Sequence, residues 1–310
     1  MDRRRFLEIA GKGSLGLVLS TGVLAANNSS SMGRKKKPQA KDIQDYLRSL
    51  CEVPEPSVDR IIVGKADTVV SKIGTAWMPY WKTCRKALKL GINTLVVHEP
   101  TFYTHRELDF KDSDYFRADV PGRREYFRLR AEKIKWINEN GLVIIRSHDV
   151  PDKVAGFGIP YSLGEVLGFS EGDLIRSRKF YNVYKIEPKP ASEVARYIAE
   201  RLKGLGQPGV AFYGDENYKV SSVGVGTGCI CNPIQFMDLE PDLFIGVDDT
   251  IRTWTQATYA EDTGRPLVVI NHGTSEENGM KMLNAELKKA FPDKEVVHFE
   301  QGCGYKWITA

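Results

Sequence analysis

In NTLVVHEP, residues 93–100, an apolar run ends in two polar side chains. The run TLVV consists of apolar and β-branched residues, which predicts a short strand buried on both faces. This strand ends in His98 and Glu99, at the point where the chain must turn. A strand that served only packing would end in Gly, Asn or Asp, so the two polar side chains predict a functional site at the strand end.

The same pattern occurs twice more along the chain. LVIIRSHD (142–149) and LVVINHG (267–273) are apolar strands that lead into His148 and His272. Continuous apolar strands with short connections predict an α/β fold, in which parallel strands are covered by helices on both faces. Because ligands gather beyond the carboxyl ends of such strands, we expect His98, His148 and His272 to lie at one site.

Helical and strand patterns fill most of the remaining chain. The spacing of apolar residues predicts helices at 40–53, 81–91, 124–141 and 251–262, and a helix followed by a strand within 190–214. Further strands are expected within 60–64, 219–226 and 241–250. The segment 101–126 has no clear period and is expected to be a long loop or a pair of short elements over the site.

The first 26 residues predict a signal peptide, with a basic start, an apolar stretch and small residues suited to cleavage. RRRFL (3–7) resembles the twin-arginine export motif, and an ordinary secretory leader is the alternative. The apolar stretch is short for a membrane span, and a polar linker (27–38) follows it. These features predict an exported, periplasmic protein without a lasting membrane anchor.

Composition indicates an ordinary globular protein. The chain has 310 residues, of which 42% are hydrophobic and 27% charged. Removal of residues 1–25 takes away four basic and two acidic residues, so the formal net charge falls from +4 to +2. A nearly neutral protein, with one short lysine run (35–37) in the linker, is not expected to bind nucleic acid. The five Cys residues are scattered and do not predict a disulfide framework.

A carboxylate lies close in sequence to each strand-end His. Glu99 is adjacent to His98, Asp152 follows His148 by four residues, and Glu276 follows His272 by four residues. Imidazole and carboxylate are the ligands of hydrolytic zinc, manganese, iron or nickel centres, and two such metals can share a carboxylate. The sequence therefore predicts a metal site with room for two ions.

Alternative roles exist for several of these residues. In HGTSEENG, Thr274 and Glu277 are expected to form a capping box at a helix start, which leaves Glu276 free for metal. Asp149 can cap or turn the chain beside His148, and Asp152 is the preferred ligand.

Three further motifs have structural alternatives. His105 is either a lid or proton-transfer group or a solvated surface residue. VGVGTG (223–228) is interpreted as a tight turn beneath the site rather than a phosphate loop, because no clear helix follows it. Cys229 and Cys231 can ligate a soft metal or serve as structural thiols.

The segments VVHEPTF (96–102), SHDVPD (147–152) and NHGTSEENG (271–279) together resemble the Nif-three-like family, also known as dinuclear metal-centre hexameric proteins or GTP cyclohydrolase 1 type 2 homologues. The resemblance implies two α/β lobes, 39–170 and 171–310, with largely parallel sheets covered by helices. It places a centre of two divalent metal ions at strand carboxyl ends between the lobes. It also implies a homohexamer.

Matching positions within the resemblance give each site residue an expected role. The expected metal ligands are His98, Glu99, Asp152, His272 and Glu276, and His148 is the expected catalytic residue beside them. Glu99 stands where the family has a second His, which makes the site harder and more anionic.

Other departures from the family pattern concern the surrounding chain. HDVPD keeps only the first and last residues of its motif, and KIGTAWMP (72–79) lacks an Asp that family members carry. The stretch between Phe180 and Gly228 is too short for the extra domain of longer members.

Two functions are compatible with this pattern. The first is a dinuclear metal-dependent hydrolase, acting on an unknown small molecule, in which the metals activate a water and His148 transfers a proton. The alternative is a non-catalytic metal-binding or scaffold protein that keeps the fold.

Overall fold

The structure is a computed structural model that describes residues 37–107 and 122–308. The expected signal peptide (1–26) and linker residues 27–36 lie outside the described residues, as does 108–121 of the expected loop. Within the described ranges, no helix has both the length and the apolar character needed to cross a membrane.

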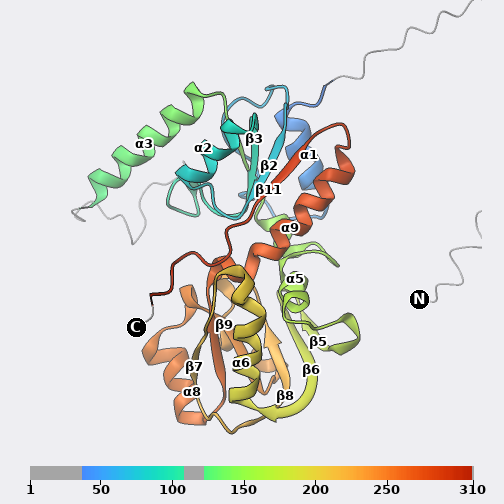
Figure 1. Ribbon diagram of the computed structural model, residues 1–310, viewed down its shortest axis with the longest axis vertical. Helices are drawn as coiled ribbons and strands as arrows, with labels where there is room; N and C mark the ends of the chain where they lie inside the picture. The colour runs from blue at the N-terminus through green and yellow to red at the C-terminus, as the bar shows by residue number, and fades with distance from the viewer. Residues whose placement is uncertain (1–36, 108–121, 309–310) are drawn as a thin grey trace, which may run out of the picture. The chain divides into compact units, whose positions relative to one another are not determined.

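The first sheet has five strands in the order β1-β4-β3-β2-β11. Figure 1 labels β3, β2 and β11 of this sheet. Strands β4, β3, β2 and β11 are parallel, and β1 is antiparallel to β4. Their bounds are Ile61–Val63 (β1), Ile73–Ala76 (β2), Thr94–Val97 (β3), Val143–Arg146 (β4) and Val296–Phe299 (β11).

Helices cover both faces of this sheet. Alternate residues of each strand point to opposite faces and therefore pack in two different cores. Val96 and Ile145 pack with apolar residues of α1 (Ala40–Ser49) and α9 (His272–Ala290). Leu95 and Ile144 point to the other face and pack with α2 (Trp81–Lys89) and α3 (Arg123–Glu139). The burial of both faces explains why these strands read as unbroken apolar runs.

The second sheet has six strands in the order β5-β6-β8-β9-β10-β7. The central strands β8, β9 and β10 are parallel, and β5, β6 and β7 pair antiparallel at the edges. The bounds are Leu174–Arg178 (β5), Tyr181–Pro190 (β6), Ala211–Tyr213 (β7), Lys219–Val225 (β8), Leu243–Val247 (β9) and Leu267–Ile270 (β10).

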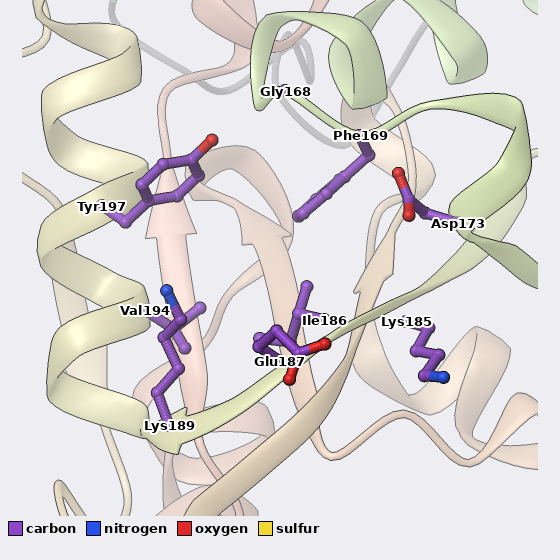
Figure 2. Close-up of a pocket in the computed structure, with 9 residues that line it drawn as sticks. All are labelled: Gly168, Phe169, Asp173, Lys185, Ile186, Glu187, Lys189, Val194 and Tyr197. Atoms are coloured by element: carbon purple, nitrogen blue, oxygen red, sulfur yellow. The ribbon is translucent and has the colours of Figure 1, made fainter.

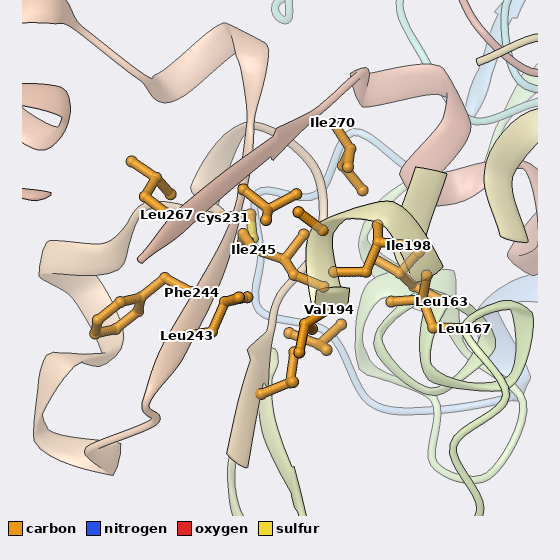
Figure 3. Close-up of a cluster of buried hydrophobic side chains, with 14 of the residues drawn as sticks. Leu163, Leu167, Val194, Ile198, Cys231, Leu243, Phe244, Ile245, Leu267 and Ile270 are labelled. Atoms are coloured by element: carbon orange, nitrogen blue, oxygen red, sulfur yellow. The ribbon is translucent and has the colours of Figure 1, made fainter. Parts of the chain in front are cut away.

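Residues from α5 and α6 pack on the central strands of the second sheet (Figure 3). Leu163 and Ile198 are fully buried against Ile245 and its neighbours. The bounds of these two helices are Ile159–Val166 (α5) and Ala191–Leu202 (α6), and the remaining helices are α4 (Asp149–Lys153), α7 (Pro233–Phe236) and α8 (Thr258–Thr263). Single turns are η3 (Glu171–Asp173), η4 (Lys203–Leu205), η5 (Gly228–Ile230), η6 (Met237–Leu239), η7 (Asp248–Thr250) and the π-helical η8 (Thr253–Ala257).

The expected α/β class, with two helix-covered sheets, is confirmed, and the sheet pairing adds a detail that the sequence did not predict. Strand β11 lies within 171–310, which was expected to form the second lobe, yet it pairs in parallel with β2 of the first sheet. The preceding helix α9 makes this return possible. It begins directly after β10 of the second sheet, and its later residues Met280, Leu283 and Leu287 lie in the core beneath the first sheet.

Candidate metal centre

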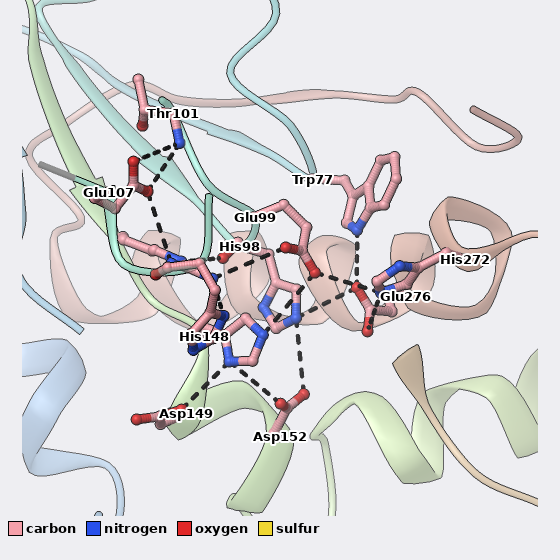
Figure 4. A network of polar contacts seen from close by, with 12 residues as sticks. Trp77, His98, Glu99, Thr101, Glu107, His148, Asp149, Asp152, His272 and Glu276 are labelled. Carbon is pink, nitrogen blue, oxygen red and sulfur yellow. Dashed lines mark hydrogen bonds and ion pairs between the residues drawn. The ribbon is translucent and has the colours of Figure 1, made fainter. Parts of the chain in front are cut away.

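Three strand ends bring the predicted residues into one polar cluster (Figure 4). His98 and Glu99 follow β3, and His148 lies between β4 and α4, which carries Asp152. His272 opens α9 after β10, and Glu276 lies one helical turn later on the same face. Both sheets therefore contribute side chains to the cluster.

Glu276 lies at the centre of this cluster, and its two oxygens face two different imidazoles. Its Oε2 is 3.3 Å from His98 Nε2, and its Oε1 is 3.1 Å from His272 Nε2. Glu99 Oε1 is 3.3 Å from His272 Nε2, and Asp152 Oδ1 is 3.7 Å from His98 Nε2. The imidazoles of His98 and His272 thus each face two carboxylates at 3.1–3.7 Å.

Several atoms that point into the cluster have no hydrogen-bond partner. His98 Nε2, His272 Nε2 and Asp152 Oδ1 are buried and unpartnered. Buried polar atoms are rarely left in this state, because each unpaired group costs free energy. Three sets of donor atoms in the cluster are close enough together to hold a metal ion. They are His98, Glu99 and His148; His98, Asp152 and Glu276; and Glu99, His272 and Glu276.

The charges of the cluster favour a bound cation. Burial alone would raise the pKa of Glu276, but His272 and His98 outweigh it and hold that pKa well below its ordinary value. Burial alone would lower the pKa of His98, yet Glu276, Asp152 and Glu99 raise it to about 9. Burial also raises the pKa of Asp152 to about 6. The buried carboxylates therefore make the imidazoles of His98 and His272 hold protons tightly, and a metal ion can replace those protons.

Asp249 orients His272 from outside the cluster. Asp249 Oδ2 lies 2.7 Å from His272 Nδ1, which leaves His272 Nε2 facing Glu99 and Glu276. The neighbouring Asp248 accepts a hydrogen bond from the backbone N–H of His272 at 3.0 Å. A carboxylate behind a histidine is typical of metal sites, because it fixes the tautomer of the ligand.

Asp59 performs a similar task for His148. It is buried, and its carboxylate accepts hydrogen bonds from the backbone N–H groups of His148, Asp149 and Val150 at 2.7–2.8 Å. Its charge thus caps the start of α4 and fixes the position of Asp152 one turn later. Neither Asp59 nor Asp249 was predicted from the sequence. For Asp249, an acidic pair directly after the apolar strand LFIGV was the available signal.

The sequence of this chain matches a known protein family. A family model described as Duf34/NIF3 (NGG1p interacting factor 3) matches residues 121–302, more than half of the chain. The chain belongs to this family. No curated protein matches it.

Solved structures of NIF3-like proteins share the fold at low sequence identity. A hypothetical protein of Staphylococcus aureus, SA1388, is 18% identical, with a TM-score of 0.66 over 87% of this chain and 99% of that one. A Bacillus cereus protein related to NIF3 is 14% identical, with a TM-score of 0.66 over 89% and 100%. Reduced HcgD of Methanocaldococcus jannaschii is 19% identical, with a TM-score of 0.60 over 84% and 97%. At these identities the likeness establishes the fold alone.

The helix start in this NIF3 chain differs from the predicted one. The expected capping box of Thr274 and Glu277 is wrong, because α9 already begins at His272 with Asn271 as its N-cap. Asp248 accepts from the His272 N–H and allows this earlier start. Glu277 instead accepts from the backbone N–H groups of Gln301 and Gly302 and lies 2.6 Å from His298. Glu276 takes no part in the cap, as expected, but the reason is that the N-cap residue is Asn271 and not Thr274.

A buried arginine, Arg146, links His105 to the cluster. Arg146 donates to the backbone carbonyls of His98 at 3.0 Å and of His105 at 2.7 Å, and it also contacts the His105 ring. The ring of His105 packs edge-on against His148, with 5.1 Å between centroids. His105 thus borders the cluster, and burial followed by the charge of Arg146 lowers its pKa to about 4.

The glycine-rich turn lies directly against the cluster. Gly228 has a φ of +53°, and a Cβ at this position would lie 2.3 Å from Glu276 Oε1 and 3.1 Å from His272 Nε2. The adjacent Cys229 is exposed, whereas Cys231 is a buried thiol that donates to the Ile245 carbonyl. Neither Cys belongs to the donor sets found among the described residues.

Two hollows differ in their relation to this cluster. One of about 280 Å³ lies between α6 and β6, where Figure 2 shows Phe169, Ile186 and Tyr197 around it. None of its lining residues belongs to the cluster. A larger cavity of about 480 Å³ is lined by Glu99, His272 and Asp249 together with aromatic side chains. A molecule in the larger cavity would lie beside the cluster.

We expect Asp249→Asn to weaken metal binding about tenfold to a hundredfold, the usual effect of losing a carboxylate behind a ligating histidine. The physical cause is the loss of the negative charge that holds the His272 ring. The dissociation constant of the metal, measured by competition with a chromogenic chelator, checks this. Asp262→Asn, an exposed change on α8, is the control. Equal metal affinity in the two variants would contradict a supporting role for Asp249.

Proposed function

We propose that the cluster binds two divalent metal ions and that the protein is a metal-dependent hydrolase of a small molecule. The observation that carries this proposal is the position of Glu276, whose two oxygens face His98 and His272 separately. A carboxylate placed in this way can bridge two ions. The unpartnered nitrogens of both imidazoles support the same assignment.

Two of the three donor sets share Glu276. His98, Asp152 and Glu276 would hold one ion, and Glu99, His272 and Glu276 would hold the other. With three carboxylates and two imidazoles, the set is rich in oxygen donors, which suits zinc, manganese, iron or nickel better than a soft ion such as Cu(I). When bound, such ions lower the pKa of a coordinated water and polarise a substrate oxygen.

His148 is the residue best placed to move a proton at this site. Its ring stacks on His98 with 4.5 Å between centroids, and its Nδ1 lies 3.3 Å from Asp149 Oδ1 and 3.5 Å from Asp152 Oδ2. These carboxylates can hold Nδ1–H and leave Nε2 to accept a proton from water and return it to the leaving group. Nε2 is 3.9 Å from Glu99 Oε1, on the cluster side of the ring.

We expect His148→Ala to lower the turnover number about a hundredfold or more and to leave the metal content unchanged, because a proton-transfer group is lost while Glu276 remains. Turnover is measured on a panel of phosphoesters, amides and cyclic nucleotides, and metal content by elemental analysis. Loss of metal from this variant would make His148 a ligand instead, through the set that it forms with His98 and Glu99. Wild-type protein that holds metal but turns over no substrate class would favour a non-catalytic metal-binding protein.

A further inference from the structure

The cavity beside the cluster has two chemically different ends. Its volume is about 480 Å³, within the range of small-molecule sites. Glu99 and His272, which belong to the cluster, line one part of it. Trp77 connects the two parts, since it lines the cavity and also donates from Nε1 to Glu276 Oε2 at 2.8 Å (Figure 4). A ligand in this cavity can therefore reach the cluster and extend away from it.

Aromatic rings form much of the rest of the wall. Tyr80, Trp81 and Tyr103 line the cavity alongside Trp77. The indole of Trp81 packs edge-on against Trp136, with 5.2 Å between centroids, which limits its movement. Flat, firmly held rings are suited to contact another aromatic ring.

Tyr103 is held over the cavity by an unusual backbone. Its φ is +68°, a conformation in which a non-glycine residue is uncommon. Its side chain is 40% exposed and packs edge-on against Tyr126, with 5.7 Å between centroids. A large ring that stays exposed on strained backbone at the edge of a cavity indicates a contact with a ligand.

The charged groups of the cavity disfavour a polyanionic ligand. Among the described residues that line it, Lys133 is the only Lys or Arg. The Lys133 ammonium is buried and donates to the carbonyls of Pro79 at 2.7 Å and Thr101 at 3.0 Å, so it is occupied in holding two segments of the wall. Glu99 and Asp249 add negative charge. A triphosphate chain would find no available cationic side chain here, and only the proposed metal ions could offset its charge.

We propose that this cavity binds the aromatic ring of an uncharged substrate, whose reacting group lies at the end formed by Glu99 and His272. The proposal rests on the proposed metal-dependent function and names the class of substrate for that site. Ring stacking and burial provide the affinity, and the metal-binding cluster positions the polar group.

Two chelating probes that differ only in the group beside the hydroxamate test this assignment. Binding of 2-naphthohydroxamic acid and of acetohydroxamic acid to metal-reconstituted protein is measured by calorimetric titration. Both compounds can chelate the metals, and one of them carries an aromatic ring. We expect the naphthyl compound to bind at least about tenfold tighter, because its ring is buried in the cavity.

Variants show whether the gain comes from this cavity. Trp81→Ala and Tyr103→Ala should each reduce the naphthyl advantage several-fold and leave the affinity for acetohydroxamate unchanged. Trp254→Ala, which removes an 83% exposed indole outside the cavity, should keep the full advantage. Tyr103→Ala alters a partly exposed side chain and provides the test if Trp81→Ala fails to fold.

The outcomes separate this inference from the proposed function. If acetohydroxamate binds and the naphthyl compound binds no tighter, the aromatic site is refuted while the metal centre stands. A naphthyl advantage that survives both cavity variants refutes it equally. If neither compound binds the reconstituted protein, no metal ion is accessible from this cavity and the substrate assignment is refuted, whereas the metal content of the same protein tests the metal centre separately.

Discussion

Glu276→Gln is expected to weaken metal binding by more than about a hundredfold. This exceeds the usual effect of removing a carboxylate that only supports a ligating histidine, because Glu276 is itself a proposed ligand. The hydrolysis that we propose for this site should fall to background in the same variant. The substitution keeps the size of the side chain and removes its charge, between two imidazole nitrogens that lie 3.1 and 3.3 Å away. Because Glu276 belongs to two of the three donor sets, both ions should be affected.

Glu286→Gln is the matched control for this prediction. Glu286 lies on the same helix, α9, and its carboxylate contacts Tyr46 and Lys289 far from any donor set. Competition titration with a chelator gives the metal affinity of both variants, and circular dichroism shows whether each is folded. A folded Glu276→Gln protein that binds metal as tightly as Glu286→Gln would show that Glu276 is not a ligand.

Gly228→Ala is expected to abolish metal binding although it replaces none of the proposed ligands. The new methyl group would lie 2.3 Å from Glu276 Oε1 and 3.1 Å from His272 Nε2, so the turn or the ligands must move. The positive φ of +53° adds about 1–2 kcal/mol of backbone strain to the free energy of folding.

Gly141→Ala separates strain from the blocked site. Gly141 has a φ of +64°, and a Cβ there would meet no atom within 4 Å. We expect the two variants to lose a similar free energy of unfolding from strain, with a further loss at Gly228 from the clash. Metal titration of the folded proteins should show normal affinity for Gly141→Ala only. Equal metal affinity in both variants would place the metal away from the glycine-rich turn.

The parts of the fold that the sequence predicted are those with local patterns. The runs TLVV, VIIR and LVVI are strands buried on both faces, and each leads into a histidine of the cluster. Parallel packing places His98 and His148 together, because the carboxyl ends of β3 and β4 share one edge of the first sheet. His272 follows β10 of the second sheet, so its arrival at the same cluster depends on contacts between the two sheets. The helix cap predicted next to Glu276 was wrong. Its four-residue spacing from His272 was nevertheless sufficient to predict that both side chains lie on the same face of the helix.

The features that the sequence did not predict depend on contacts between distant segments. Asp59 caps the backbone of His148 from 89 residues away, and nothing in its neighbourhood in the sequence distinguishes it from a surface Asp. Trp77 contacts Glu276 across 199 residues. The return of β11 to the first sheet is equally non-local, since its short run VVHF does not reveal its partner strand.

We propose that His98, Asp152, Glu99, His272 and Glu276 hold two metal ions. Anomalous X-ray diffraction from crystals of the metal-reconstituted protein, recorded above and below the absorption edge of the added metal, locates such ions. We expect two anomalous peaks with Glu276 between them, one next to His98 and the other next to His272. Peaks elsewhere on the protein, or none beside Glu276 at full metal loading, would contradict this account.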